Sequence, residues 1–269
     1  MSLLTEIVEG VRTDLRARKA DVSPAALRRQ AEARGPRMAP EAVETALRGP
    51  DGVRLIAEVK RASPSAGRLA AIDRPGALAA QYAAGGAAAI SVLTEPRHFG
   101  GSLDDLREVR GSVTVPLLRK DFVVDPYQLA EAAATGADLV LLIVAALTEP
   151  QLGSLLREAG DHGLAVLVEA HTAAEVDAAL AAGARIVGVN ARDLATFRVD
   201  REAFPRLVAP VPADVVTVAE SGVRGPDDVR AYAEAGADAV LVGSALVTDA
   251  RPADAVAAML AAGRRGNRA

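Results

Sequence analysis

Lysine and glutamate residues at the ends of apolar runs are the residues of this chain best suited to chemistry. Lys120 lies between Arg119 and Asp121, directly after one such run. A lysine at the end of a buried strand is costly unless it has charged partners or a chemical task. Glu58 and Lys60 end another apolar run two residues apart, so both side chains point to the same side of a strand. These residues are candidates for proton transfer and charge stabilisation.

Polar residues end several other apolar runs in the same way. They are Glu169, Asn190 with Arg192, Glu220 with Ser221, and Gly243 with Ser244. A single charged residue after a strand usually belongs to the surface, but a series of strands that all end in polar residues indicates one shared site. A purely structural ring of ion pairs is the alternative interpretation.

Metal and thiol chemistry have little support in the sequence. The chain has no cysteine, and His98, His162 and His171 show neither His-x-His nor His-x-x-x-His spacing. We therefore expect no metal site and no cofactor. Lysines and glutamates alone leave two options open, which are acid–base catalysis and a Schiff base formed by a lysine.

Glycine and serine residues late in the chain predict a phosphate site. The segments 221–226 and 243–244 supply glycines, hydroxyls and backbone N–H groups near the expected starts of helices. Phosphates bind at such places because the N–H groups point at the anion. The glycines can also be interpreted as simple turns.

Strands and helices alternate from residue 53 onward. The expected strands are 54–60, 88–93, 113–118, 139–144, 165–168, 186–189, 215–219 and 239–242. Glycine motifs around Gly86, Gly136, Gly183 and Gly236 each end a helix before a strand, about every 50 residues, as two strand–helix units of about 25 residues would require. Eight such units predict an α/β fold, the (β/α)8 TIM barrel. An open doubly wound sheet is the second possibility, although the turn at 60–65 lacks the Gly-x-Gly-x-x-Gly pattern.

Helical patterns precede the barrel. Apolar residues at helical spacing begin at Leu3, and two further helical segments cover 24–33 and 40–47. We expect a helical extension over 1–50, a barrel over 53–262 and a single domain over 1–269. The net charge of −4 gives no basic patch for nucleic acid, and no apolar run is long enough to span a membrane. The expected protein is cytoplasmic, with a small-molecule ligand and no nucleic-acid or membrane partner.

Six motifs, in order, resemble those of the indole-3-glycerol phosphate synthases, the ring-closing enzymes of tryptophan biosynthesis. They are IAEVKRASPS (56–65), SVLTE with FGGS (91–95 and 99–102), LRKDF (118–122), LVE (167–169), GVNARDL (188–194) and AESG (219–222). The helical extension also resembles that of the family.

The resemblance implies a carboxy-lyase that closes the indole ring of 1-(2-carboxyphenylamino)-1-deoxyribulose 5-phosphate with loss of carbon dioxide and water. Lys120 resembles the general acid of ring closure, and Glu169 the acid–base group of the dehydration. Lys60 resembles a second lysine that binds the anthranilate carboxylate and can protonate the leaving hydroxyl. The sequence leaves open which lysine serves which step, and whether nearby cations or nearby glutamates dominate the pKa of Lys120.

The same resemblance assigns orienting and binding roles to the other candidates. Glu58 and Asn190 would orient the catalytic groups, and Glu220 would position the ribulose hydroxyls or share in proton transfer. The residues expected to hold substrate, phosphate and anthranilate ring are Ser63, Phe99, Phe122, Arg192, Ser221, Gly222, Gly243 and Ser244. The chain differs from the family's usual motifs at Ala66, at Ala191 and at Ser244–Ala245, but none of these is a proposed proton-transfer residue.

Other functions are compatible with a phosphate-binding barrel. A phosphoribosylanthranilate isomerase, one of the sugar-phosphate isomerases, expects a cysteine and an aspartate, and this chain has no cysteine. A Schiff-base aldolase would use Lys120, and a non-catalytic scaffold subunit is a third alternative. We expect a monomer, with a dimer as the second possibility.

Overall fold

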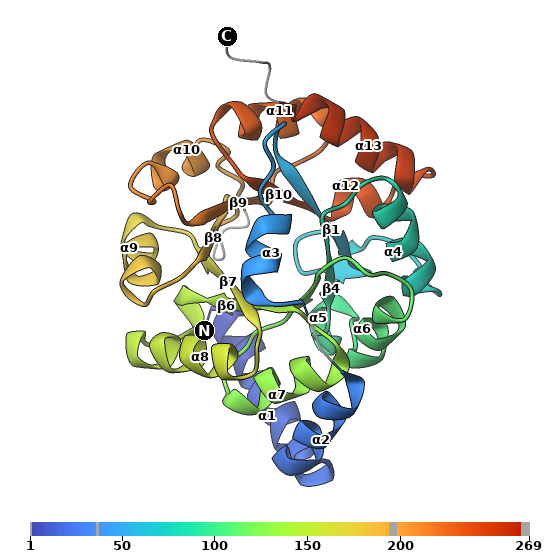
Figure 1. Cartoon of the computed structure of the whole chain (residues 1–269), viewed down its shortest axis with the longest axis vertical. Coiled ribbons are helices and arrows are strands. Elements are labelled where there is room, and N and C mark those ends of the chain that lie inside the picture. The colour runs from blue at the N-terminus through green and yellow to red at the C-terminus, as the bar shows by residue number, and fades with distance from the viewer. Residues whose placement is uncertain (1, 36–37, 194–197, 265–269) are drawn as a thin grey trace.

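The computed structural model describes residues 2–35, 38–193 and 198–264, and its core is a closed barrel of eight parallel strands (Figure 1). Strand β1 pairs with both β4 and β10, which closes the sheet. The strands are β1 (Arg54–Val59), β4 (Ala89–Leu93), β5 (Leu117–Lys120), β6 (Leu139–Ile143), β7 (Ala165–Ala170), β8 (Ile186–Asn190), β9 (Val216–Glu220) and β10 (Ala239–Val242). The predicted (β/α)8 barrel is confirmed, and the open doubly wound sheet is wrong.

Helices that follow each strand of the barrel surround it (Figure 1). They are α4 (Pro75–Ala84), α5 (Pro96–Phe99), α6 (Leu103–Arg110), α7 (Pro126–Thr135), α8 (Glu149–Asp161), α9 (Ala173–Ala181), α10 (Ala203–Val208), α11 (Pro226–Glu234), α12 (Ser244–Val247) and α13 (Pro252–Ala262), with a short 3-10 helix η1 (Val144–Ala146) after β6. A two-stranded hairpin, β2 (Ala62–Ser63) with β3 (Gly67–Arg68), follows β1 and was not predicted. The repeated glycines have positive φ, as expected of residues that end a helix.

Two apolar layers hold the barrel together. Side chains such as Ile56, Leu118, Leu167 and Leu241 fill its interior, while a larger cluster packs between the strands and the surrounding helices. Successive residues of a strand point to opposite faces, so each strand is apolar on both sides. In such a barrel the next inward-facing position beyond the apolar filling lies at the mouth.

The third strand of the barrel differs from its prediction. It was expected at 113–118, but β5 begins at Leu117 and ends at Lys120. Pro116 has no N–H to donate to a strand ladder, and the guanidinium of Arg110 binds the carbonyl groups of Val113 and Val115. At the other end of the strand, Lys120 is the last residue and pairs in register with Leu93. The strands β7, β8 and β9 likewise extend to include Glu169, Asn190 and Glu220.

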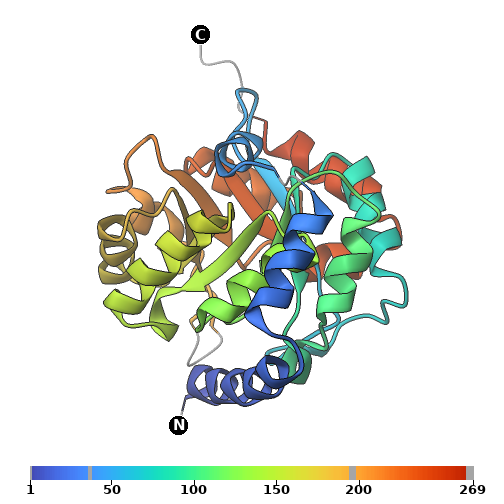
Figure 2. The same cartoon turned by 60° about the horizontal axis from the view of Figure 1, so that its bottom comes forward.

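The predicted helical extension consists of α1 (Leu3–Asp21), α2 (Pro24–Arg34) and α3 (Pro40–Ala46). Helix α1 lies across one end of the barrel (Figure 2). It is fixed there by ion pairs from Arg18 to Glu131, at 2.8 Å, and from Asp14 to Arg97. Val43, on α3, packs with the interior side chains of the barrel. Among the described residues, no helix is long and apolar enough to cross a membrane.

Candidate active site

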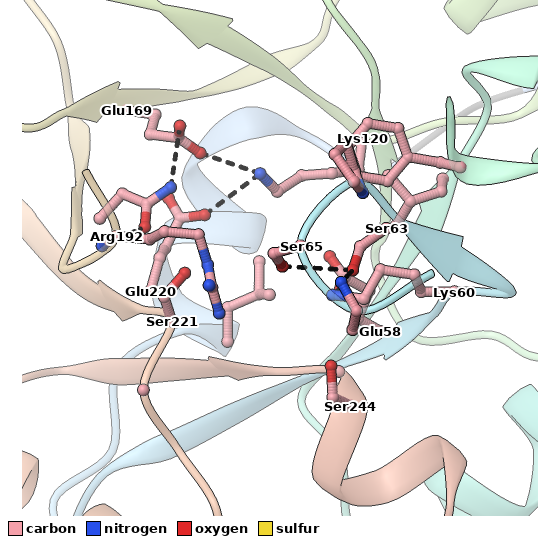
Figure 3. Close-up of a pocket in the computed structure, with 18 of the residues that line it drawn as sticks. Glu58, Lys60, Ser63, Ser65, Lys120, Glu169, Arg192, Glu220, Ser221 and Ser244 are labelled. Atoms are coloured by element: carbon pink, nitrogen blue, oxygen red, sulfur yellow. Dashed lines mark hydrogen bonds and ion pairs between the residues drawn. The ribbon is translucent and has the colours of Figure 1, made fainter. Parts of the chain in front are cut away.

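A pocket of about 370 Å³ opens at the carboxyl ends of the strands (Figure 3). It is lined by every candidate site residue named from the sequence: Glu58, Lys60, Ser63, Phe99, Lys120, Phe122, Glu169, Asn190, Arg192, Glu220, Ser221, Gly222, Gly243 and Ser244. The strand residues in this list line the pocket for the same reason. Glu58, Lys120 and Glu220 each continue the inward-facing row of their strand, two positions after an interior apolar residue.

Lys120 points between two buried carboxylates. Its Nζ donates to Glu169 Oε2 at 2.9 Å and lies 3.3 Å from Glu220 Oε2. Burial alone would lower the pKa of Lys120, but the negative charges of Glu169, Glu220 and Glu58 outweigh it, and the net effect raises the pKa. The balance that the sequence left open therefore favours a lysine that carries its proton at neutral pH.

The pKa values of the two carboxyl groups are shifted in opposite directions by this arrangement. Burial raises the pKa of Glu169, but Lys120, His171 and a hydrogen bond from Asn190 Nδ2 at 3.1 Å together lower it below its usual value. Burial is also the largest influence on Glu220, and together with the neighbouring Glu169 it raises the pKa of Glu220 despite Lys120. The pKa of Glu169 is thus lowered and that of Glu220 raised, so Glu220 is the more easily protonated of the two carboxylates.

Glycines make room for these charged side chains. Any Cβ on Gly188 would overlap with Glu220 Oε1, and one on Gly243 would overlap with Glu58 Oε1 and approach Lys60 Nζ. Lys60 Nζ lies 2.5 Å from Glu58 Oε1, so the second lysine is fixed on the opposite side of the pocket from Glu169 (Figure 3). Gly188 in β8 and Gly243 after β10 thus allow the side chains of Glu220, Glu58 and Lys60 to pack closely against the backbone.

Arg119 and Asp121, which flank Lys120 in the sequence, are not its partners. Their side chains point outward and are buried between β5 and α7, where Arg119 Nη2 lies 2.8 Å from Asp121 Oδ2 and 3.3 Å from Glu131 Oε2. Glu131 also binds Arg18 of α1. This buried network fixes the strand that carries Lys120 and ties it to the helix that covers the pocket.

The predicted phosphate loops have an unusual backbone. Ser221 has a φ of 67° and Gly222 a φ of 83°, so two consecutive residues are left-handed. Such curvature can turn successive N–H groups toward an anion, here just before α11. Arg201, which was not singled out from the sequence, donates from Nε to the carbonyl of Gly222 at 3.0 Å and also lines the pocket.

Apolar side chains also line the pocket. The rings of Phe99 and Phe122 lie 6.1 Å apart at a tilt of 42°. Leu3, Leu4 and Ile7 of α1 also line the pocket. The sequence identified their helical face but gave no sign that it covers the site, because no local pattern reports which distant element a helix contacts.

Metal-binding groups of three or more His, Asp or Glu residues are absent from the part of the chain that the structure describes. Of the six sequence motifs, only the end of GVNARDL, Leu194, lies outside the described residues. His171, whose spacing in the sequence did not indicate a metal ligand, contacts Glu169. Its Nε2 lies 3.4 Å from Glu169 Oε1.

Comparisons with known proteins agree with this geometry. The family model for indole-3-glycerol phosphate synthase matches residues 4–259. The chain is 58% identical to indole-3-glycerol phosphate synthase 1 of Streptomyces coelicolor, over 98% of this chain and 96% of that protein. It is 56% identical to indole-3-glycerol phosphate synthase of Mycobacterium sp. (strain KMS), over 97% of this chain and 95% of that protein.

Solved structures show the same fold at low sequence identity. A 3-hexulose-6-phosphate synthase from Salmonella typhimurium matches with a TM-score of 0.65 and 18% identity, covering 78% of this chain and 98% of that one. A thiamine phosphate pyrophosphorylase from Pyrococcus furiosus matches with a TM-score of 0.61 and 17% identity, covering 82% and 96%. The family model and the full-length relatives go further than the fold, and they show that this chain belongs to the indole-3-glycerol phosphate synthase family.

Proposed function

We propose that this chain catalyses the formation of indole-3-glycerol phosphate from 1-(2-carboxyphenylamino)-1-deoxyribulose 5-phosphate. The observation that carries the proposal is the Lys120–Glu169–Glu220 cluster at the mouth of a barrel of this family. The reaction needs an acid for the ketone oxygen during ring closure, a base for the later dehydration and a binding site for three charged or aromatic parts of one substrate. The pocket offers a residue for each.

Lys120 is the proposed general acid of ring closure. The aromatic carbon that bears the carboxylate attacks the ketone carbon, and the ketone oxygen gains a proton as the new carbon–carbon bond forms. A lysine with a raised pKa is protonated before the reaction, and it can still give its proton to an alkoxide, which is a much stronger base. Its ammonium also stabilises the developing negative charge on that oxygen.

Lys60 is the proposed partner of the anthranilate carboxylate. Its ion pair with Glu58 fixes the ammonium on the far side of the pocket from Glu169. Loss of carbon dioxide leaves the electron pair of the broken bond in the ring, which restores aromaticity. This step needs little help beyond orientation, which Phe99 and Phe122 would give by packing on the ring.

Glu169 and Glu220 are the proposed acid–base pair of the dehydration. The last step removes a proton from the substrate and expels the former ketone oxygen as water, which forms the double bond of the indole. A lowered pKa keeps Glu169 ionised and able to accept a proton, while Glu220 holds one to share. Arg192, Ser221, Gly222, Gly243 and Ser244 would hold the phosphate end, with Ser63 on the neighbouring loop.

The decisive experiment is direct. The purified protein is mixed with the carboxyphenylamino-deoxyribulose phosphate in EDTA, and indole fluorescence is followed over time. We expect a rise that falls at least about 10²-fold in Lys120→Ala, as is typical when a general acid is removed. Lys19→Ala, which removes an exposed lysine of α1, is the matched control and should keep the activity.

Two other outcomes would contradict the proposal. Trapping of Lys120 by borohydride only in the presence of substrate would indicate a Schiff-base enzyme. Binding of the substrate without product would indicate a scaffold subunit.

The single domain over 1–269, the cytoplasmic location and the monomeric state also stay predictions. Gel filtration of the full chain tests whether the protein is a monomer.

A further inference from the structure

His171 connects the proposed base to a second carboxylate outside the pocket. It directly follows β7, its side chain is 11% exposed, and it does not line the pocket. Its Nε2 lies 3.4 Å from Glu169 Oε1, and its Nδ1 lies 3.3 Å from Glu175 Oε2. The backbone N–H of His171 donates to the same Glu175 oxygen at 2.8 Å. The ring is therefore held between two carboxylates.

The start of α9 sets this arrangement. Thr172 caps the helix by accepting a hydrogen bond from the backbone N–H of Glu175 at 3.2 Å, which places Glu175 in the first helical turn. The Glu175 side chain folds back onto His171 and fixes the ring through Nδ1. Replacement of Glu175 by glutamine would keep an acceptor for the backbone N–H but remove the charge.

The geometry favours an imidazolium. If Nδ1 donates to Glu175, a neutral ring would leave the lone pair of Nε2 only 3.4 Å from the Glu169 oxygen, which is repulsive. A protonated ring places a positive charge near that oxygen instead. The buried Nε2 has no aligned hydrogen-bond acceptor among the described residues, so its contact with Glu169 is mainly one of charge.

The charged groups around the His171 ring also favour its protonated form. Three carboxylates face it: Glu169 on its own strand, Glu175 on α9 and Glu220 on β9. The positive charge of Lys120 acts from the far side of Glu169. Burial lowers the pKa of His171, but Glu175 and Glu169 outweigh burial and raise it.

We propose that His171 is a positioning residue, which Glu175 holds as a cation against Glu169 so that this carboxylate stays ionised and correctly turned for the dehydration. The inference rests on the proposed role of Glu169 in that step. Glu169 then has a cation on each oxygen, Lys120 on Oε2 and His171 on Oε1 with Asn190. The arrangement would explain how a carboxylate buried at the barrel mouth avoids protonation.

The first test needs no activity. The chain has three histidines, so the ring-nitrogen NMR signals of labelled histidine can be assigned with His171→Gln and titrated. We expect His171 to titrate above its ordinary range, and to lose this shift in Glu175→Gln. The carboxyl signal of Glu169, assigned with Glu169→Gln, should titrate at higher pH in His171→Gln because a nearby cation is lost. Unshifted titrations of both groups would overturn the proposal.

The second test is kinetic. His171→Gln should lower kcat by about 10-fold, less than loss of the base itself, with KM changed less than about 2-fold. The acidic limb of its kcat–pH profile should move to higher pH. In Glu175→Gln the loss should appear only above the lowered pKa of His171. An effect on KM alone, or an unmoved acidic limb, would contradict the positioning role.

Two variants serve as matched controls. His162→Gln changes a histidine at the other end of the barrel, just before β7, and Glu149→Gln changes an exposed glutamate in the first turn of α8. Neither should move the profile. If the unmodified chain forms no product, the proposed reaction is wrong, while the two NMR titrations still decide the Glu175–His171–Glu169 contact.

Discussion

Replacement of Lys120 by methionine would separate its role in catalysis from its role in stability. Methionine keeps the length of the apolar stem but removes the ammonium that lies 2.9 Å from Glu169 and 3.3 Å from Glu220. Both carboxylate side chains are nearly fully buried, at 3% and 2% exposure. Removing one partner of a buried ion pair costs about 3–5 kcal/mol, because the remaining charge is left without compensation.

The cost should depend on pH. Without Lys120, the folded pKa of Glu169 rises above its unfolded value, so the folded state binds more protons than the unfolded state. Because the unfolded states of the two proteins titrate alike, the stability of the variant relative to the parent should fall as pH rises above about 2, the folded pKa of Glu169 in the parent, and recover in stronger acid. At pH 7 we expect the loss to be about 3 kcal/mol or more.

Urea unfolding at several pH values measures this directly. Far-UV circular dichroism is the suitable signal, since the chain has no tryptophan. Lys19→Met is the matched control, because its ion pair with Asp125 at 2.7 Å is exposed and should contribute less than about 1 kcal/mol. A loss for Lys120→Met below that of the control, or one that does not vary with pH, would refute the assignment of a charge-balanced cluster. Its turnover should fall at least about 10²-fold at every pH.

Three further predictions concern the neighbours of Lys120. Glu169→Gln should lower kcat far more than it changes KM in steady-state assays, and an effect confined to KM would exclude an acid–base role. Glu220→Gln should flatten the pH dependence of stability: burial raises the pKa of Glu220 from 4.5 to about 8, so the unmodified chain should lose stability as pH rises through that window, by up to about 1.4 kcal/mol per pH unit. Equal slopes in urea titrations of the two proteins would contradict this. Gly188→Ala should displace the Glu220 carboxylate and lower kcat, whereas Gly160→Ala, on an open face of α8, should not; equal kcat values in the two variants would mean that Gly188 is not needed for the site.

The sequence by itself determined the barrel, the helical extension and the candidate pocket residues. These features could be predicted because they depend on local sequence patterns. Alternation along a strand indicates which residues point inward, and a polar residue that continues an inward-facing apolar row must lie at the mouth of the barrel. Glu58, Lys120, Glu169, Asn190 and Glu220 all follow this rule. The repeated glycines Gly86, Gly136, Gly183 and Gly236 all have positive φ, and their spacing of about 50 residues predicted two strand–helix units per repeat.

Only the tertiary structure decided how these groups act on one another. The ion pair that joins Arg18 of α1 to Glu131 of α7 and the cover provided by Leu3 of α1 depend on contacts between distant segments. So do the raised pKa of Lys120 and the place of His171 beside Glu169. A pKa is set by burial and by distances of a few ångströms to other charges, and residue spacing along the chain carries no record of either.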